Sequence, residues 1–216
     1  MRLTTLSTVF AALALSACVS ASDGPAARPL IGLAATMPMG PTVAAPKGYV
    51  AMCRDQPQLC VEASPTSIAA LSSDAQLALL QRVNLRVNAR VRQMTDVQAF
   101  GVQGLWTRAG GGDFGAAGDC KAIAVEKRVE LEAAGVPASA LFYAIAYRND
   151  IGLHAVLVAH TDQGDMVLDS RSPRIVPWSQ APYTWVQRQS QGEAFAWAMV
   201  IRPAGAAAAL VLASAD

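Results

Sequence analysis

The sequence predicts a single α+β domain, in which helices come first along the chain and antiparallel strands follow. Two segments with helix signals lie at about 74–94 and 119–134. Strand-like runs then follow between turn residues, at 141–148, 153–160, 165–169 and 196–202. Because the two kinds of element are segregated along the chain instead of alternating, an α+β arrangement is expected.

The composition allows a buried core and excludes several classes of protein. The chain has 216 residues, of which 53% are hydrophobic and 15% charged. No apolar run reaches the ~18 residues that a membrane span needs, which argues against a multi-pass membrane protein. The 17 basic and 16 acidic residues give a net charge of +1, a balance that argues against nucleic-acid binding and against an acidic disordered chain.

The N-terminal segment has the pattern of an export signal. Residues 1–17 combine a weakly positive start with a short apolar stretch. They lead into Leu15-Ser16-Ala17-Cys18, which resembles the lipobox of bacterial lipoproteins, in which the cysteine is lipidated after cleavage. Ordinary cleavage a few residues later remains the alternative. Both interpretations place the mature protein in the periplasm, and lipidated Cys18 would anchor it to the outer membrane.

Three segments follow the signal. Residues 18–48 are rich in Ala, Pro, Gly and Ser and are expected to form a tether. Residues 49–203 contain every predicted helix and strand and form the domain. Residues 204–216 form an alanine-rich tail that is too short to span a membrane.

The first predicted helix, about 74–94, has two distinct faces. Its apolar stripe recurs at helical spacing, at Leu80, Val83, Val87, Val91 and Met94. Arg82, Arg86 and Arg90 follow one another at every fourth residue on another face. We expect this arginine face to be solvated; binding of an anionic partner is the alternative.

A glycine-rich stretch at 109–115 precedes the second helix and is expected to be a loop. It is not a phosphate-binding loop, because no Lys-Ser/Thr pair follows it. The second helix is expected to begin at Asp119 or Cys120 and to end near Ala134, where Gly135 supplies a stop signal.

The cysteines divide into a pair and a single thiol. Cys53 and Cys60 are close together in a turn-rich segment, so an oxidising compartment should join them in a disulfide. Such a bond would contribute roughly 2–3 kcal/mol to stability. A zinc site is the weaker alternative, because no second Cys or His pair at ligand spacing accompanies them. Cys120 is then the unpaired thiol and a candidate nucleophile.

A catalytic thiol needs a base and a group that orients the base. Cys120 lies at a predicted helix N-terminus, where backbone N–H groups and the helix dipole stabilise a thiolate or an oxyanion. If residues 161–164 form a hairpin loop, Asp169 pairs opposite Val156, and His154 then lies on the same face as Asp169.

Each of these residues also has a purely structural interpretation: a packed cysteine, a core histidine and a turn aspartate. The other histidine, His160, is expected to be a satisfied core or surface residue. It is about 20 Å from His154 along an extended strand, so the two cannot share a metal ion.

Three segments around the candidate residues carry a family resemblance: Gly118-Asp119-Cys120-Lys121, Gly152-Leu153-His154-Ala155-Val156-Leu157 and Val167-Leu168-Asp169-Ser170. Further matches are Ala45-Pro46-Lys47-Gly48-Tyr49, Val83-Asn84, Val87-Asn88, Trp106 and Pro177-Trp178. With these motifs, over roughly residues 45–202, the chain resembles the bacterial transglutaminase-like cysteine proteinases.

The resemblance implies a papain/transglutaminase-like core, with the nucleophile helix packed on an antiparallel sheet. It implies a protease that cleaves a protein amide bond with Cys120 as nucleophile, His154 as general base and acid, and Asp169 as the orienting group. The best-known members are periplasmic LapG-type proteases. They cut a surface adhesin, bind calcium beside the nucleophile and are sequestered by a membrane receptor for cyclic di-GMP.

The sequence departs from that pattern where calcium is concerned. Lys121 and Ala122 stand where the LapG type carries acidic residues, and only Asp119 keeps a carboxylate. Because calcium takes six to eight oxygen ligands, we expect no calcium cofactor. The expected partner is a protein substrate in the envelope or at the cell surface. Regulation by a membrane receptor stays open.

Two alternative functions remain. The same thioester intermediate could pass its acyl group to an amine, as in a transglutaminase. The fold could also serve as a non-catalytic binding module of an envelope lipoprotein.

Overall fold

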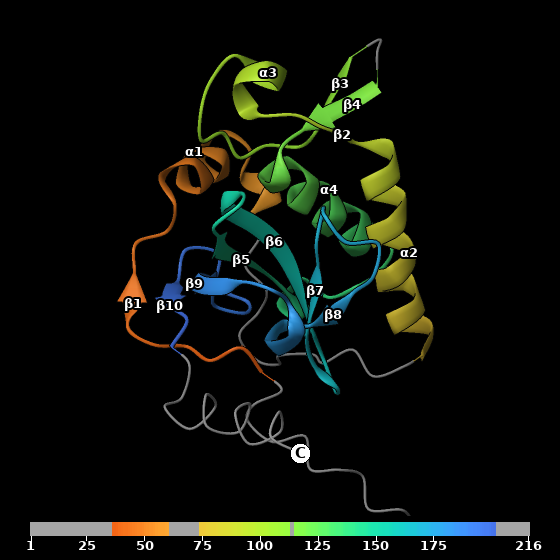
Figure 1. Cartoon of the computed structure of the whole chain (residues 1–216), viewed down its shortest axis with the longest axis vertical. Helices are drawn as coiled ribbons and strands as arrows, with labels where there is room; N and C mark the ends of the chain where they lie inside the picture. Colours follow the sequence, from red (N-terminus) through yellow and green to blue (C-terminus); the bar gives the residue numbers. More distant parts are fainter. Residues whose placement is uncertain (1–35, 61–73, 113–114, 202–216) are drawn as a thin grey trace, which may run out of the picture. The chain divides into compact units, whose positions relative to one another are not determined.

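The computed structural model describes residues 36–60, 74–112 and 115–201. Within them, most of the helical structure precedes an antiparallel seven-stranded sheet, so the predicted α+β class is confirmed (Figure 1). No helix among the described residues is long and apolar enough to cross a membrane. The export signal at 1–17, the lipidation candidate Cys18 and the tail at 204–216 lie outside the described residues.

The main sheet has the strand order β1-β10-β9-β5-β6-β7-β8, and every neighbouring pair is antiparallel. Its strands are β1 (Thr42–Val43), β5 (Leu141–Arg148), β6 (Gly152–Thr161), β7 (Gly164–Leu168), β8 (Val176–Pro177), β9 (Thr184–Gln189) and β10 (Trp197–Met199). The central strands β5, β6 and β7 therefore match the predicted runs closely.

Four α-helices accompany the sheet in the described residues: α1 (Lys47–Asp55), α2 (Asp74–Arg90), α3 (Asp96–Phe100) and α4 (Cys120–Ala133). Helix α4 packs against β6, and α2 runs along α4 and contacts β7 (Figure 1). Short 3-10 turns lie at η2 (Pro57–Leu59), η3 (Ala138–Ala140) and η4 (Trp178–Gln180).

A second, small sheet corrects two expectations. Helix α2 ends at Arg90 instead of about 94, because the chain then forms β2 (Arg92–Gln93), which pairs in parallel with β4 (Gly115–Gly118). The glycine-rich stretch is not a plain loop, since β3 (Gly110–Gly112) pairs with β4. Glycines carry no side-chain pattern, so backbone pairing of this kind leaves no periodic signal.

The central strands are covered on both faces, which explains their nearly continuous apolar sequence. Leu141 and Tyr143 of β5 belong to the core under the helices, whereas Phe142 and Ala144 belong to the core on the opposite face. The helical side also contains an edge-to-face aromatic cluster of Tyr49, Trp106, Tyr143 and Trp197.

Part of the stretch expected to be a tether belongs to the folded domain. Met37 is only 2% exposed, and its N–H donates to Asp165 Oδ2 (2.7 Å). His160 Nδ1 lies 2.7 Å from Asp165 Oδ1, so this histidine is satisfied by a hydrogen-bond partner, as expected. Strand β1 then adds to the sheet edge beside β10.

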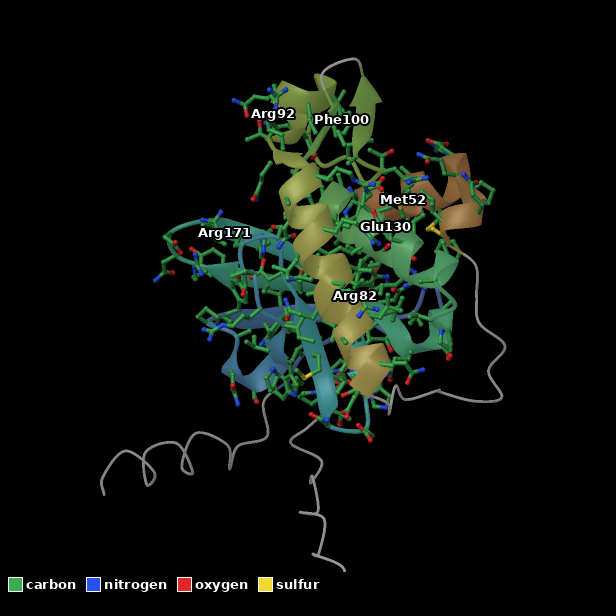
Figure 2. All side chains as sticks on the ribbon, turned by 90° about the vertical axis from the view of Figure 1, so that its right-hand side faces the viewer. Met52, Arg82, Arg92, Phe100, Glu130 and Arg171 are labelled. Atoms are coloured by element: carbon green, nitrogen blue, oxygen red, sulfur yellow. A yellow bond between two sulfur atoms is a disulfide. The ribbon has the colours of Figure 1, made fainter. Side chains whose placement is uncertain are left out.

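The predicted disulfide between Cys53 and Cys60 is confirmed, with a Cα–Cα distance of 5.4 Å. The zinc alternative for this pair is therefore wrong. Cys53 lies in α1, near the labelled Met52 in Figure 2, where the yellow bond is visible. Cys120 is a free, partly exposed cysteine.

The arginine face of α2 is solvated and also contacts α4. Arg86 and Arg90 form ion pairs with Glu130 of α4, at 2.6 and 2.5 Å. Arg82 is exposed and makes no such pair (Figure 2). All three arginines are exposed, so the expected solvated face is confirmed, and the packing of α2 on α4 adds an acidic neighbour for two of them.

Candidate active site

The start of α4 fixes the position of the thiol. Asp119 caps the helix by accepting hydrogen bonds from the N–H groups of Lys121 (2.9 Å) and Ala122 (3.2 Å). A Cβ on Gly118 would lie 2.5 Å from Ala122 Cβ, so the chain can enter the helix at this angle only with glycine there. Cys120 is therefore the first residue of α4, as predicted, and the N–H of Ala155 donates to its Sγ (3.4 Å).

The β6–β7 hairpin brings the histidine and the aspartate together. Leu157 pairs with Leu168, which is the register expected from the sequence, although the loop itself is only the two residues 162 and 163. Asp169 follows β7 directly, and His154 Nε2 lies 2.7 Å from Asp169 Oδ1. The side chains of His154 and Asp169 are only 4% and 8% exposed, so their interaction is shielded from water.

His154 and Asp169 shift each other's pKa. Burial favours the neutral form of Asp169, but hydrogen bonds from His154 and Tyr183 outweigh it and lower the pKa of Asp169 to about 2. Burial also opposes the charge on His154, yet the hydrogen bonds with Asp169 and Cys120 raise the pKa of His154 to about 9. Because an ionised carboxylate can only accept, Nε2 of His154 is the donor, and Nδ1 is left for the thiol.

Both oxygens of Asp169 are held by further donors. Tyr183 Oη donates to Oδ2 (2.5 Å), and the N–H of Arg171 donates to Oδ1 (2.9 Å). The Tyr183 ring also lies 5.5 Å from the His154 imidazole, centroid to centroid. No feature of the sequence marks Tyr183, because it lies in a connection with no motif and its contact with Asp169 depends on the folded sheet.

The backbone around Asp169 is held from α2 and α4. Asn88 Nδ2 donates to the carbonyl of Asp169 (2.9 Å). The ammonium of Lys127 donates to the carbonyl of Leu168 (3.2 Å) and to Asn84 Oδ1 (2.7 Å). Lys127 is fully buried, and burial lowers its pKa to about 7. Asn84 and Asn88 belonged to the matched motifs and share one face of α2, but nothing in the sequence singled out Lys127.

A lysine next to the thiol in the sequence, Lys121, pairs with two carboxylates. Lys121 Nζ forms ion pairs with Asp119 Oδ2 and with Asp96 Oδ2, the latter at 2.9 Å. Burial opposes its charge, but the hydrogen bonds to Asp119 and Asp96 outweigh burial and raise the pKa of Lys121. Asp96 is 6% exposed and also accepts from the N–H of Leu105, an arrangement that sequence analysis missed.

These residues do not fit a calcium ion. Calcium takes six to eight oxygen ligands, whereas here an ammonium lies between the two carboxylates. Across the part of the chain that the structure describes, no cluster of three or more His, Cys, Asp or Glu is arranged to hold a metal.

Cys120 and His154 open into a surface cleft of about 390 Å³. Gln93 of β2 lines the cleft on one side, and Leu153, which is 68% exposed, lines it at the start of β6. The thiol is therefore accessible to an extended peptide, while His154 and Asp169 lie behind it in the protein interior.

A family model described as bacterial transglutaminase-like cysteine proteinase matches residues 39–204. The chain belongs to this family. It is therefore a cysteine peptidase with a transglutaminase-like fold, and a protein is its substrate. No protein with a curated description matches the sequence.

Solved structures of LapG from Legionella pneumophila are similar to this chain. The calcium-bound form is 24% identical with a TM-score of 0.48, covering 58% of this chain and 70% of the other. An EGTA-treated form is 26% identical with a TM-score of 0.45, covering 52% and 62%. A further structure is 25% identical with a TM-score of 0.41, covering 51% and 62%.

Proposed function

We propose that this cysteine peptidase hydrolyses its substrate with Cys120 as nucleophile, His154 as general base and acid, and Asp169 as the orienting group. The observation that carries the proposal is the buried 2.7 Å contact between His154 Nε2 and Asp169 Oδ1. It fixes the tautomer of His154 so that Nδ1 faces the thiol side of the ring, the arrangement that thiol activation requires.

In the first half of the reaction, the Cys120 thiolate forms a C–S bond with the scissile carbonyl carbon, and the carbonyl oxygen becomes an oxyanion. Protonated His154 gives its proton to the leaving amine as the C–N bond breaks. In the second half, His154 takes a proton from water, which attacks the thioester. The C–S bond then breaks, and the acid product leaves with the thiol restored.

The helix cap limits which groups can donate a hydrogen bond to the oxyanion. Asp119 already accepts from the N–H groups of Lys121 and Ala122, so these two amides are occupied. We assign the oxyanion to the N–H of Cys120 and to the side-chain amide of Gln93, which lines the same cleft.

The proposal needs no calcium. The positive charge of Lys121 pairs with both Asp96 and Asp119 beside the nucleophile and offsets part of their negative charge. An ammonium held by two largely buried carboxylates can keep the start of α4 in place without a metal ion.

The compartment is also part of the proposal. We place the protein in the periplasm on the strength of the signal pattern at 1–17 and the lipobox-like Cys18. Its substrate is then a protein of the envelope or the cell surface, and a lipid on Cys18 is its only membrane attachment. Regulation by a membrane receptor belongs to the same hypothesis.

The test compares the envelope proteins of cells producing the full chain with those of cells producing Cys120→Ala, at equal amounts of folded protein. We expect new protein N-termini in the first and none of them in the second. Arg82→Gln, an exposed change on α2, serves as the matched control and should behave like the unaltered chain. New N-termini that persist in Cys120→Ala would refute the assignment.

The same experiment separates the alternatives. Incorporation of a labelled primary amine into envelope proteins, dependent on Cys120, would identify acyl transfer. If neither new N-termini nor amine incorporation is found, the chain would be a non-catalytic binding module.

A further inference from the structure

A second hollow adjoins the cleft that contains the thiol. It has a volume of about 580 Å³ and is lined by Asp169, whereas the cleft is lined by Cys120 and His154. Gln93 and Arg171 line both the hollow and the cleft, so the two adjoin along these residues. A peptide that crosses Cys120 and continues past Arg171 enters this hollow.

The wall of the hollow is strongly basic. It contains Arg148, Arg171 and Arg174, and its single acidic residue is Asp169. Asp169 does not neutralise the arginine side chains, because its oxygens accept from His154, Tyr183 and a backbone N–H.

The three arginines differ in whether their guanidinium groups have a partner. Arg148 pairs with Asp150 at 2.6 Å, and its guanidinium lies 5.4 Å from the centre of the Tyr183 ring. Arg171 and Arg174 are exposed, and among the described residues their guanidinium groups make no hydrogen bond or ion pair. Two unpaired guanidinium groups thus border the path of the substrate.

We infer that this hollow is a substrate subsite that binds an acidic side chain. Guanidinium groups pair with carboxylates through two parallel hydrogen bonds, and the substrate of this peptidase is a protein, whose anionic side chains are Asp and Glu. Because the hollow adjoins the cleft along one side, the acidic residue of an extended peptide lies at one fixed position on one side of the scissile bond. The inference rests on the proposed role of Cys120.

The test uses a peptide library made by chymotrypsin digestion of a bacterial lysate, with cut sites identified by mass spectrometry. For the full chain and for Arg82→Gln, we expect Asp or Glu to be enriched about fivefold at one fixed position relative to the cut sites. A factor of this size corresponds to the binding free energy of one exposed ion pair. Arg82 is a suitable control because it is an exposed arginine that lines neither the hollow nor the cleft. The double variant Arg171→Gln/Arg174→Gln should cut the library without this enrichment.

Charge reversal at one position sharpens the test. Arg174→Glu should lower the enrichment of Asp and Glu and favour Lys or Arg at the same position. Because Arg174 is exposed, this variant is expected to fold even if the double variant does not.

A binding experiment separates this inference from the catalytic assignment. Immobilised Cys120→Ala should retain acidic peptides from the same library, and adding Arg171→Gln/Arg174→Gln to it should abolish that retention. Acidic peptides retained without any cleavage by the full chain would support the subsite and refute the catalytic assignment. Cleavage that depends on Cys120 but shows no acidic preference would overturn the subsite and leave the catalytic assignment intact. Absence of both cleavage and selective retention would overturn both.

Discussion

Replacing Asp169 by Asn should abolish most of the activity while leaving the fold intact. The asparagine keeps the shape of the side chain but removes the charge that favours the imidazolium of His154. The rise in the pKa of His154 from its ordinary value of 6.5 to about 9 corresponds to roughly 3 kcal/mol in favour of the charged ring. In comparable triads the loss of this group lowers turnover roughly ten-thousand-fold.

The pKa of His154 can be measured directly. The chain has only two histidines, so an NMR titration of the imidazole signals is simple, and a His160→Gln variant assigns them. We expect the pKa of His154 to be about 9 in the unaltered protein and clearly lower in Asp169→Asn, because burial of the ring remains while the carboxylate that opposes its effect is lost. Cleavage of the peptide library is measured in parallel.

The same interaction predicts how stability depends on pH. A raised pKa of His154 stabilises the folded state fully below pH 6.5, and this contribution disappears as the pH rises through about 9. A lowered pKa of Asp169 stabilises the folded state above pH 3.8, and this contribution disappears as the pH falls through about 2. Asp169→Asn should therefore lose most stability near pH 5–6 and least above pH 9.

Two results would refute this reasoning. One is an unchanged pKa of His154 in Asp169→Asn, which would mean that the carboxylate does not determine the charge of the ring. The other is turnover close to that of the unaltered enzyme, which would leave Asp169 as a turn residue only.

Chelation by EGTA should change neither turnover nor melting temperature, because Lys121 already supplies the positive charge between Asp96 and Asp119; activity that EGTA removes and calcium restores would contradict this. Lys127→Met should remove a pH dependence of stability, because burial lowers the pKa of Lys127 to about 7 from 10.5 in the unfolded chain. Between pH 7 and pH 10.5, Lys127 is protonated in the unfolded chain but not in the folded protein. The free energy of unfolding of the unaltered protein, measured by chemical denaturation, should therefore rise by roughly 1 kcal/mol per pH unit relative to the variant. Equal slopes in the two proteins would show that the Lys127 ammonium is not held in a dry interior.

The parts of the fold that the sequence predicted are those specified by local signals. Helix α4 has a capping aspartate at Asp119 and ends at Ala133, shortly before Gly135, whose φ of +87° only glycine adopts readily. The β6–β7 hairpin has a fixed register because a shift by one residue would turn its apolar side chains to the wrong face. The relation of His154 to Asp169 could be deduced because both lie on this one hairpin.

The parts that could not be predicted depend on contacts between distant segments. Strand β9 contains Arg188 and Gln189, polar residues that are more typical of a surface loop than of a buried strand. Both are buried, because Met37 and Tyr49 supply hydrogen-bond partners. Tyr183 precedes that strand and reaches the site only when β9 pairs with β5. A single sequence contains no pattern that connects such residues.

The hydrogen bonds of the site show how Asp169, and through it His154, is positioned. Asp169 is held through its side chain by three donors and through its carbonyl by Asn88, so its position is determined by the sheet and α2 together. Cys120 is partly exposed at the capped start of α4, and the N–H of Ala155 donates to its sulfur. A base whose orientation is fixed in this way suits a reaction in which the imidazole must stay aligned with both the thiol and the substrate. Substitutions that loosen Asp169 should therefore lower kcat, whereas those at the rim of the cleft should act mainly on KM.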